Sequence, residues 1–143
     1  MKQILKSNII ILCDYCVGKT RLIHHFFENK FTDYYLPAIE GKVKLLNIED
    51  KNIQIHLWDK IGIERFKPAT INYLKKLRNY YCIWYLEKES FDKINNYIKD
   101  IDFYAKKNVV KIIIGNIYDK NDLRIINEEE GKKLADENGF DFF

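Results

Sequence analysis

The sequence predicts an α/β fold with a mostly parallel central sheet. Three predominantly apolar runs, at residues 8–13, 81–86 and 109–114, have the length and composition of strands that are buried on both faces. Segments between them carry apolar residues three and four positions apart, which is the spacing of amphipathic helices. Buried strands that alternate with such helices form a parallel sheet with helices on both faces. The 143 residues are expected to form a single domain, 1–143.

The composition excludes several classes of protein. With 47% apolar and 31% charged residues, the chain is typical of a folded soluble domain rather than a disordered one. A net charge of +3 is too small to indicate a nucleic-acid partner. No apolar run approaches the roughly 20 residues of a membrane span, and the N-terminus does not resemble a signal peptide. We therefore expect a cytoplasmic protein.

The N-terminal half begins with a strand at 8–13 and a helix at 19–28, whose apolar positions are 22, 23, 26 and 27. Residues 31–41 show no periodicity and are expected to form a loop. Apolar and polar residues then alternate over 43–45 and again over 53–57, on either side of a turn at 49–52, which predicts a β-hairpin. Residues 64–78 are expected to be helical beyond Pro68.

The C-terminal half alternates strands and helices. A strand at 81–86 precedes the best helical period in the chain, carried by residues 91, 94, 98, 101 and 105. Another strand, 109–114, ends at Gly115. The acidic residues 128–130 begin a helix that ends at Gly139, and residues 140–143 begin a last strand. The order is β-α-β-β-α-β-α-β-α-β, and only the hairpin is expected to be antiparallel.

A glycine, a lysine and a threonine join the first strand to the first helix. Gly18-Lys19-Thr20 is the second half of the phosphate-binding pattern, in which Gly and four further residues precede Gly-Lys-Ser/Thr. Cys13 takes the place of the first glycine. A loop between a buried strand and a helix directs backbone N–H groups and the helix dipole toward one point. This segment therefore predicts a phosphate site.

Three further stretches extend this interpretation. They are Trp-Asp-Lys-Ile-Gly-Ile-Glu-Arg-Phe at 58–66, Glu-Ser-Phe at 89–91 and Gly-Asn-Ile-Tyr-Asp at 115–119. Their order and spacing resemble the small GTPases, most closely the Rab group, whose hallmark is Trp-Asp-Thr-Ala-Gly-Gln-Glu-Arg-Phe. The resemblance extends from about Asn8 to Phe143. It implies a phosphate-loop G domain that binds GTP or GDP with Mg²⁺ and acts as a switch in vesicle and membrane traffic.

The resemblance assigns roles to the matching residues. Lys19 would neutralise the β- and γ-phosphates, and Thr20 and Asp59 would hold Mg²⁺. The N–H of Gly62 would sense the γ-phosphate. The other phosphate-loop positions that would line the nucleotide are Asp14, Cys16, Val17 and Gly18. Asn116 and Asp119 match the guanine-reading motif, and the Asp119 carboxylate favours GTP over ATP.

Several positions depart from the family pattern. Ile63 replaces the glutamine that orients the attacking water, and Ala38 replaces the switch threonine that ligates Mg²⁺. We therefore expect weak or impaired GTP hydrolysis and assign no catalytic residue. Tyr15 and Cys16 stand at usually small positions, and Ile117 replaces a lysine. A left-handed backbone at Cys13 would be disfavoured by about 1–2 kcal/mol.

Two alternatives stay open. One is a pseudo-GTPase, a protein-interaction module that binds nucleotide poorly or not at all. The other is a redox protein, because residues 13–16 read Cys-x-x-Cys at a helix N-terminus.

In the family interpretation, effector or regulatory proteins would bind residues around 31–45 and 58–74. The last strand and helix of the fold are expected to be incomplete. Without C-terminal cysteines the chain would not anchor itself in a membrane, and it would reach intracellular membranes only through partners.

Overall fold

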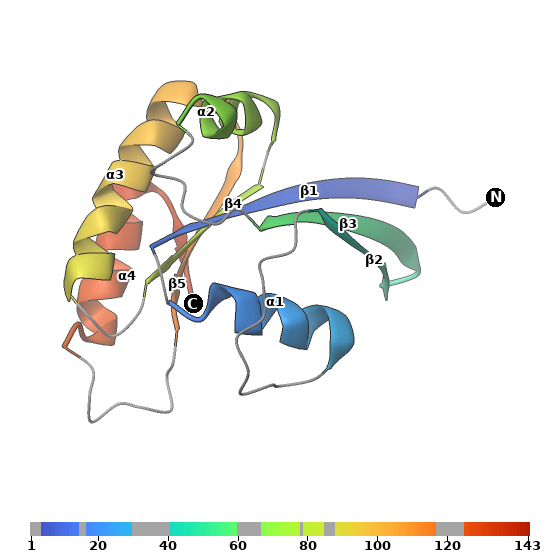
Figure 1. Ribbon diagram of the computed structural model, residues 1–143, viewed down its shortest axis with the longest axis horizontal. Helices are drawn as coiled ribbons and strands as arrows, with labels where there is room; N and C mark the ends of the chain where they lie inside the picture. The colour runs from blue at the N-terminus through green and yellow to red at the C-terminus, as the bar shows by residue number, and fades with distance from the viewer. Residues whose placement is uncertain are drawn as a thin grey trace.

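The computed structural model describes residues 4–14, 17–29, 41–59, 67–77, 79–84, 88–116 and 125–143. Within these residues, helices pack on both faces of one central sheet (Figure 1). The elements, in chain order, are β1 (Ile4–Cys13), α1 (Lys19–Glu28), β2 (Lys42–Ile48), β3 (Lys51–Asp59), α2 (Lys67–Lys76), β4 (Asn79–Trp84), α3 (Lys88–Tyr104), β5 (Val110–Gly115), α4 (Glu128–Asn138) and β6 (Asp141–Phe142).

The sheet has the strand order β2-β3-β1-β4-β5-β6. Only the β2–β3 hairpin is antiparallel, and every other neighbouring pair in this order is parallel, as the sequence predicts. In the register, Ile11 of β1 lies beside Asp59 of β3, and Cys13 lies beside Ile83 of β4. The carboxyl ends of the parallel strands therefore meet at one edge of the sheet.

Successive residues of β1 pack into two different cores, one on each face of the sheet. Ile10 and Leu12 join a core built with α3 and α4, whereas Ile9 and Ile11 join a core that contains Ile23 of α1. Figure 1 shows the same division, with α1 on one face and α2, α3 and α4 on the other. This two-sided burial is the reason that the strand reads as a continuous apolar run.

Some element boundaries differ from the predicted ones. β1 begins at Ile4 rather than residue 8, because residues 4–8 pair with β3 beyond the point where β4 begins to pair. Ile4 and Leu5 are exposed, so this extension lacks the apolar signature of a buried strand. β4 begins two residues earlier than predicted. α2 covers 67–76, with Pro68 in its first turn, where a missing N–H breaks no helical hydrogen bond.

The helix α4 has well-defined ends. The Asn127 side chain accepts a hydrogen bond from the N–H of Glu130 at 2.8 Å, and the Glu130 carboxylate accepts one from the N–H of Asn127 at 3.1 Å. This reciprocal pair is a capping box. Gly139 follows the helix in the left-handed region, at φ 66°, which confirms the predicted end of α4.

Candidate functional site

The candidate site lies where β1, β3 and β5 end and α1 begins. Asp59 is the last residue of β3, Gly115 is the last residue of β5, and Asn116 follows directly. β1 lies between β3 and β4 in the sheet, so the connections that leave this edge diverge around it. Open α/β sheets bind ligands outside the carboxyl ends of the strands at such a divergence. The edge therefore brings together three of the segments that the sequence singles out.

The N-terminus of α1 is built to face an anion. Gly18 occupies the N-cap position at φ 81° and ψ 8°, a left-handed conformation that residues with a Cβ rarely adopt. Gly18 has no side chain that could cap this end, and the first turn holds no acidic residue. α4 is the contrast within this chain, with a capping box and three glutamates in its first turn. No acidic side chain of this first turn offsets the positive end of the α1 dipole, which favours an anionic ligand there.

Lys19 adds a cation at this point. It is the first residue of α1 and is only 9% exposed, while Thr20 beside it is half-buried. A lysine near the positive end of a helix dipole is electrostatically disfavoured, and a bound phosphate would offset that effect. The position of Lys19 thus fits the role that the sequence predicts for it.

Asn116 connects the end of β5 to the loop before α1. Its Nδ2 donates a hydrogen bond of 2.6 Å to the carbonyl oxygen of Val17, 99 residues earlier in the chain. Val17 is buried, so this bond is the kind that keeps a sheltered carbonyl satisfied. The sequence places Asn116 in the guanine-reading motif but gives no sign of this supporting contact, because nothing local relates the two residues.

Cys13 ends β1 in an extended conformation. It is not among the described non-glycine residues with positive φ, so the left-handed penalty considered above does not apply. The side chain is 4% exposed and packs in the core with α1. A thiol so enclosed is poorly accessible to an oxidant or a partner thiol. This burial gives the redox interpretation no support.

Asp14 pairs with a lysine of α3. The Nζ of Lys93 lies 2.7 Å from Oδ2 of Asp14 and 3.1 Å from Oε1 of Glu89, one helical turn earlier in α3. The hydrogen bond to Asp14, followed by the one to Glu89, raises the pKa of Lys93 above its ordinary range. Sequence reasoning missed this pair, because Asp14 and Lys93 are 79 residues apart.

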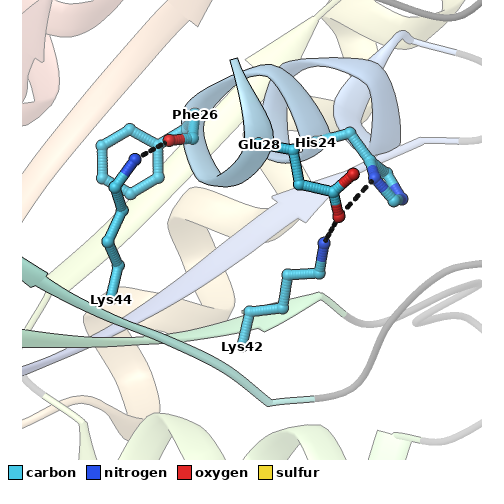
Figure 2. Close-up of polar contacts among 5 residues, drawn as sticks. All are labelled: His24, Phe26, Glu28, Lys42 and Lys44. Carbon is cyan, nitrogen blue, oxygen red and sulfur yellow. Dashed lines mark hydrogen bonds and ion pairs between the residues drawn. The ribbon is translucent and has the colours of Figure 1, made fainter. Parts of the chain in front are cut away.

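A second polar cluster holds the far end of α1 on β2. This α1–β2 cluster consists of His24, Phe26, Glu28, Lys42 and Lys44 (Figure 2). Glu28 Oε1 lies 2.8 Å from Lys42 Nζ and 3.4 Å from His24 Nδ1. The Nζ of Lys44 donates to the carbonyl oxygen of Phe26 and lies 4.8 Å from the centre of its ring. These contacts fix the direction of α1 and thereby where its N-terminus points.

Several predicted site residues lie outside the described part of the chain. These are Cys16, Gly62 and Asp119, together with the divergent positions Tyr15, Ala38, Ile63 and Ile117. The side chain of Asp59 is also outside it, although its backbone ends β3. The predicted partner-binding ranges are described only at 41–45, 58–59 and 67–74. The roles of these residues stay predictions.

Two findings concern metals and membranes. Among the described residues, no group of three or more His, Cys, Asp or Glu side chains could hold a metal ion. None of the described helices is both long enough and apolar enough to cross a lipid bilayer.

Comparison with known proteins points to one family. The sequence profile of the Ras family matches residues 8–143. The chain is 31% identical to the Ras-related protein Rab-10 of Caenorhabditis elegans, over 94% of this chain and 69% of that protein. It is also 33% identical to Rab-1 of Theileria parva, over 94% of this chain and 63% of that protein. Human Rab-8B is likewise 33% identical, over 94% of this chain and 67% of that protein. The chain thus spans about two thirds of the length of these relatives.

Proposed function

This chain belongs to the Ras family, and we propose from that premise that it binds guanine nucleotide and acts as a Rab-type switch in membrane traffic. Its effectors and regulators would bind around residues 31–45 and 58–74, and such partners would bring it to intracellular membranes. The assignment to membrane traffic rests on similarity to proteins named Rab. The assignment to nucleotide binding also rests on the residues of the candidate site.

The N-terminus of α1 carries the nucleotide-binding proposal. It combines a left-handed glycine at the N-cap, no side-chain cap, no acidic residue in its first turn and a buried Lys19. The glycine lets the backbone approach a ligand closely, and a first turn that holds a lysine and no acidic residue favours a bound anion. The Val17–Gly18 backbone would approach the phosphates, with Asn116 bonded to the carbonyl oxygen of Val17. Guanine recognition would come from Asp119, the neighbour of Asn116 in the base-reading motif.

Mg²⁺ would be held jointly by protein and nucleotide. Mg²⁺ sites for nucleotides use few protein ligands and complete the shell with phosphate oxygens and water. The hydroxyl of Thr20, in the first turn of α1, and the carboxylate of Asp59, at the end of β3, would supply the protein share. Both residues lie at the same edge of the sheet, which fits the proposal. The ion would neutralise phosphate charge.

Hydrolysis of GTP is proposed to be slow. Ras itself turns over at only about 10⁻⁴ s⁻¹ without assistance, and it has the glutamine that orients water. Ile63 has no hydrogen-bonding group for that task, and the methyl group of Ala38 cannot ligate Mg²⁺ as a threonine does. A chain with both replacements would remain in its GTP form unless a partner supplied the missing groups.

A second candidate function is that of a pseudo-GTPase, a protein-interaction module that binds nucleotide poorly or not at all. The replacements at Ala38 and Ile63 favour it because they remove parts of the machinery that cycling needs. Cys13, Tyr15 and Ile117 favour it because they depart from the family pattern at nucleotide-binding positions. The retained Lys19 and Thr20 favour the first candidate.

Calorimetric titration with GDP, a non-hydrolysable GTP analogue and ATP, with and without Mg²⁺, separates the two. We expect guanine-selective, Mg²⁺-dependent binding with a Kd below about 1 μM, which corresponds to about −8 kcal/mol. The variant Lys19→Met should lose it. Absence of binding heat from folded wild-type protein would leave the pseudo-GTPase. Single-turnover phosphate release, compared between wild type and Ile63→Gln, then tests the hydrolysis proposal.

A further inference from the structure

An ion pair connects the phosphate loop to α3. Asp14 follows the last residue of β1, and its Oδ2 lies 2.7 Å from Nζ of Lys93. That distance is in the range of charge-assisted hydrogen bonds. The two side chains are 17% and 29% exposed, so the pair is partly sheltered from solvent and salt. Lys93 is held from its other side by Glu89, at 3.1 Å.

The pair matters because of the charge that Asp14 brings to the loop. An unpaired carboxylate four residues before Gly18 would repel a phosphate ligand bound at the N-terminus of α1. For an assumed charge separation of about 10 Å and an effective dielectric constant between about 40 and 80, Coulomb's law gives a repulsion that weakens binding roughly two- to fourfold per unit of net ligand charge. The ammonium of Lys93 compensates that charge from α3.

We propose that Lys93 is a positioning residue that holds the Asp14 carboxylate and balances its charge, so that α3 helps to set the affinity of the phosphate loop for nucleotide. This inference rests on the proposed nucleotide binding. It predicts a larger effect on the triphosphate than on the diphosphate, because the triphosphate carries more negative charge. It also predicts that removing both partners of the pair is less harmful than removing Lys93 alone.

The same helix offers a matched control. Lys88, in the first turn of α3, pairs with Asp92 at 3.2 Å, and the two side chains are 69% and 56% exposed. Lys88→Met removes the same charge from the same helix without touching Asp14. It therefore reports what the loss of one α3 lysine does in general.

The experiment compares wild type with Lys93→Met, Lys93→Arg, Lys88→Met, Asp14→Asn and the double variant Asp14→Asn/Lys93→Met. Calorimetry gives the Kd for GDP and for a non-hydrolysable GTP analogue, each with Mg²⁺, at low and at high salt. Thermal unfolding confirms that every variant is folded. The Mg²⁺ complexes of GDP and of the analogue carry net charges of about −1 and about −2. We therefore expect Lys93→Met to weaken GDP binding about threefold and analogue binding about tenfold at low salt, with smaller effects at high salt.

The remaining variants decide between charge balance and a merely structural role. Lys93→Arg should bind like wild type, and the double variant should recover most of the lost affinity. The inference is overturned if Lys93→Met binds no more weakly than Lys88→Met, or if the double variant binds as weakly as Lys93→Met. A wild-type protein that binds no nucleotide would overturn the proposed function and this inference together. Wild-type binding with an unaffected Lys93→Met would overturn this inference alone.

Discussion

The bond between Asn116 and Val17 allows a sharp test of how the phosphate loop is supported. Replacing Asn116 by alanine removes the Nδ2 donor and leaves the carbonyl of a buried residue without this partner. Loss of a neutral hydrogen bond, with partial loss of solvation for the remaining acceptor, lowers the free energy of unfolding by about 1–2 kcal/mol. For a domain of this size, that change lowers Tm by about 3–7 °C.

The assay is thermal and urea unfolding of the protein without added nucleotide, so that ligand binding does not contribute. Asn116→Asp should be less stable than Asn116→Ala, because an ionised carboxylate donates no hydrogen bond and would face a carbonyl oxygen. Asn138→Ala is the matched control, since Asn138 Nδ2 also donates to a backbone carbonyl, that of Leu134 at 2.8 Å, but in α4. Both alanine variants should be destabilised, whereas only Asn116→Ala should also bind GDP more weakly. Unchanged stability in Asn116→Ala would show that the bond from Asn116 to Val17 does not stabilise the fold.

Three other residues give predictions that involve different forces. Ile94 of α3 is fully buried. Urea unfolding should show that Ile94→Ala lowers the free energy of unfolding by about 2–5 kcal/mol and Ile94→Val by about 0.5–1.5 kcal/mol. Equal effects of the two substitutions would contradict close packing around Ile94. Gly18 adopts a left-handed conformation at φ 81°, so Gly18→Ala should be destabilised by about 1–2 kcal/mol and should bind nucleotide more weakly. A variant as stable as wild type would show that no left-handed residue is needed there. Lys42, and then His24, hold the pKa of the Glu28 carboxyl below its ordinary value of 4.5. The ionised Glu28 carboxylate therefore stabilises the fold above pH 4.5, and this stabilisation is lost as the pH falls through the lowered pKa. Glu28→Gln should therefore be less stable than wild type at neutral pH and equally stable once acid protonates Glu28, whereas a difference independent of pH would contradict this assignment.

The topology could be predicted because its signals are local. A strand that is buried on both faces is apolar at every position, and β1 shows this over residues 9–13. The amphipathic period of α3 is equally clear, since Ile94, Ile98 and Ile101 all enter one core. The first four residues of β1 could not be predicted, because they pair with β3 at an exposed part of the sheet where burial selects no pattern.

In the candidate site, too, the local features could be predicted from the sequence, whereas the long-range contacts could not. Gly18, Lys19 and Thr20 are adjacent in sequence, so the pattern itself indicates the helix N-terminus that the structure then shows. The contacts that support this end join residues far apart in the chain, Asn116 with Val17 and Lys93 with Asp14. A single sequence contains no record of such pairs. The capping box at Asn127 is different, because an asparagine three residues before a glutamate is a recognisable signal for a helix start.

The central claim is that guanine nucleotide binds at the N-terminus of α1. An NMR titration of isotope-labelled protein with GDP and Mg²⁺ tests it most directly, because each backbone amide reports its own surroundings. Binding at this helix end should give saturable shifts concentrated at the amides of Gly18, Lys19 and Thr20 and at the side-chain amide of Asn116, with the amides of α4 unaffected. Shifts confined to other parts of the molecule, or none at all in folded protein, would contradict it.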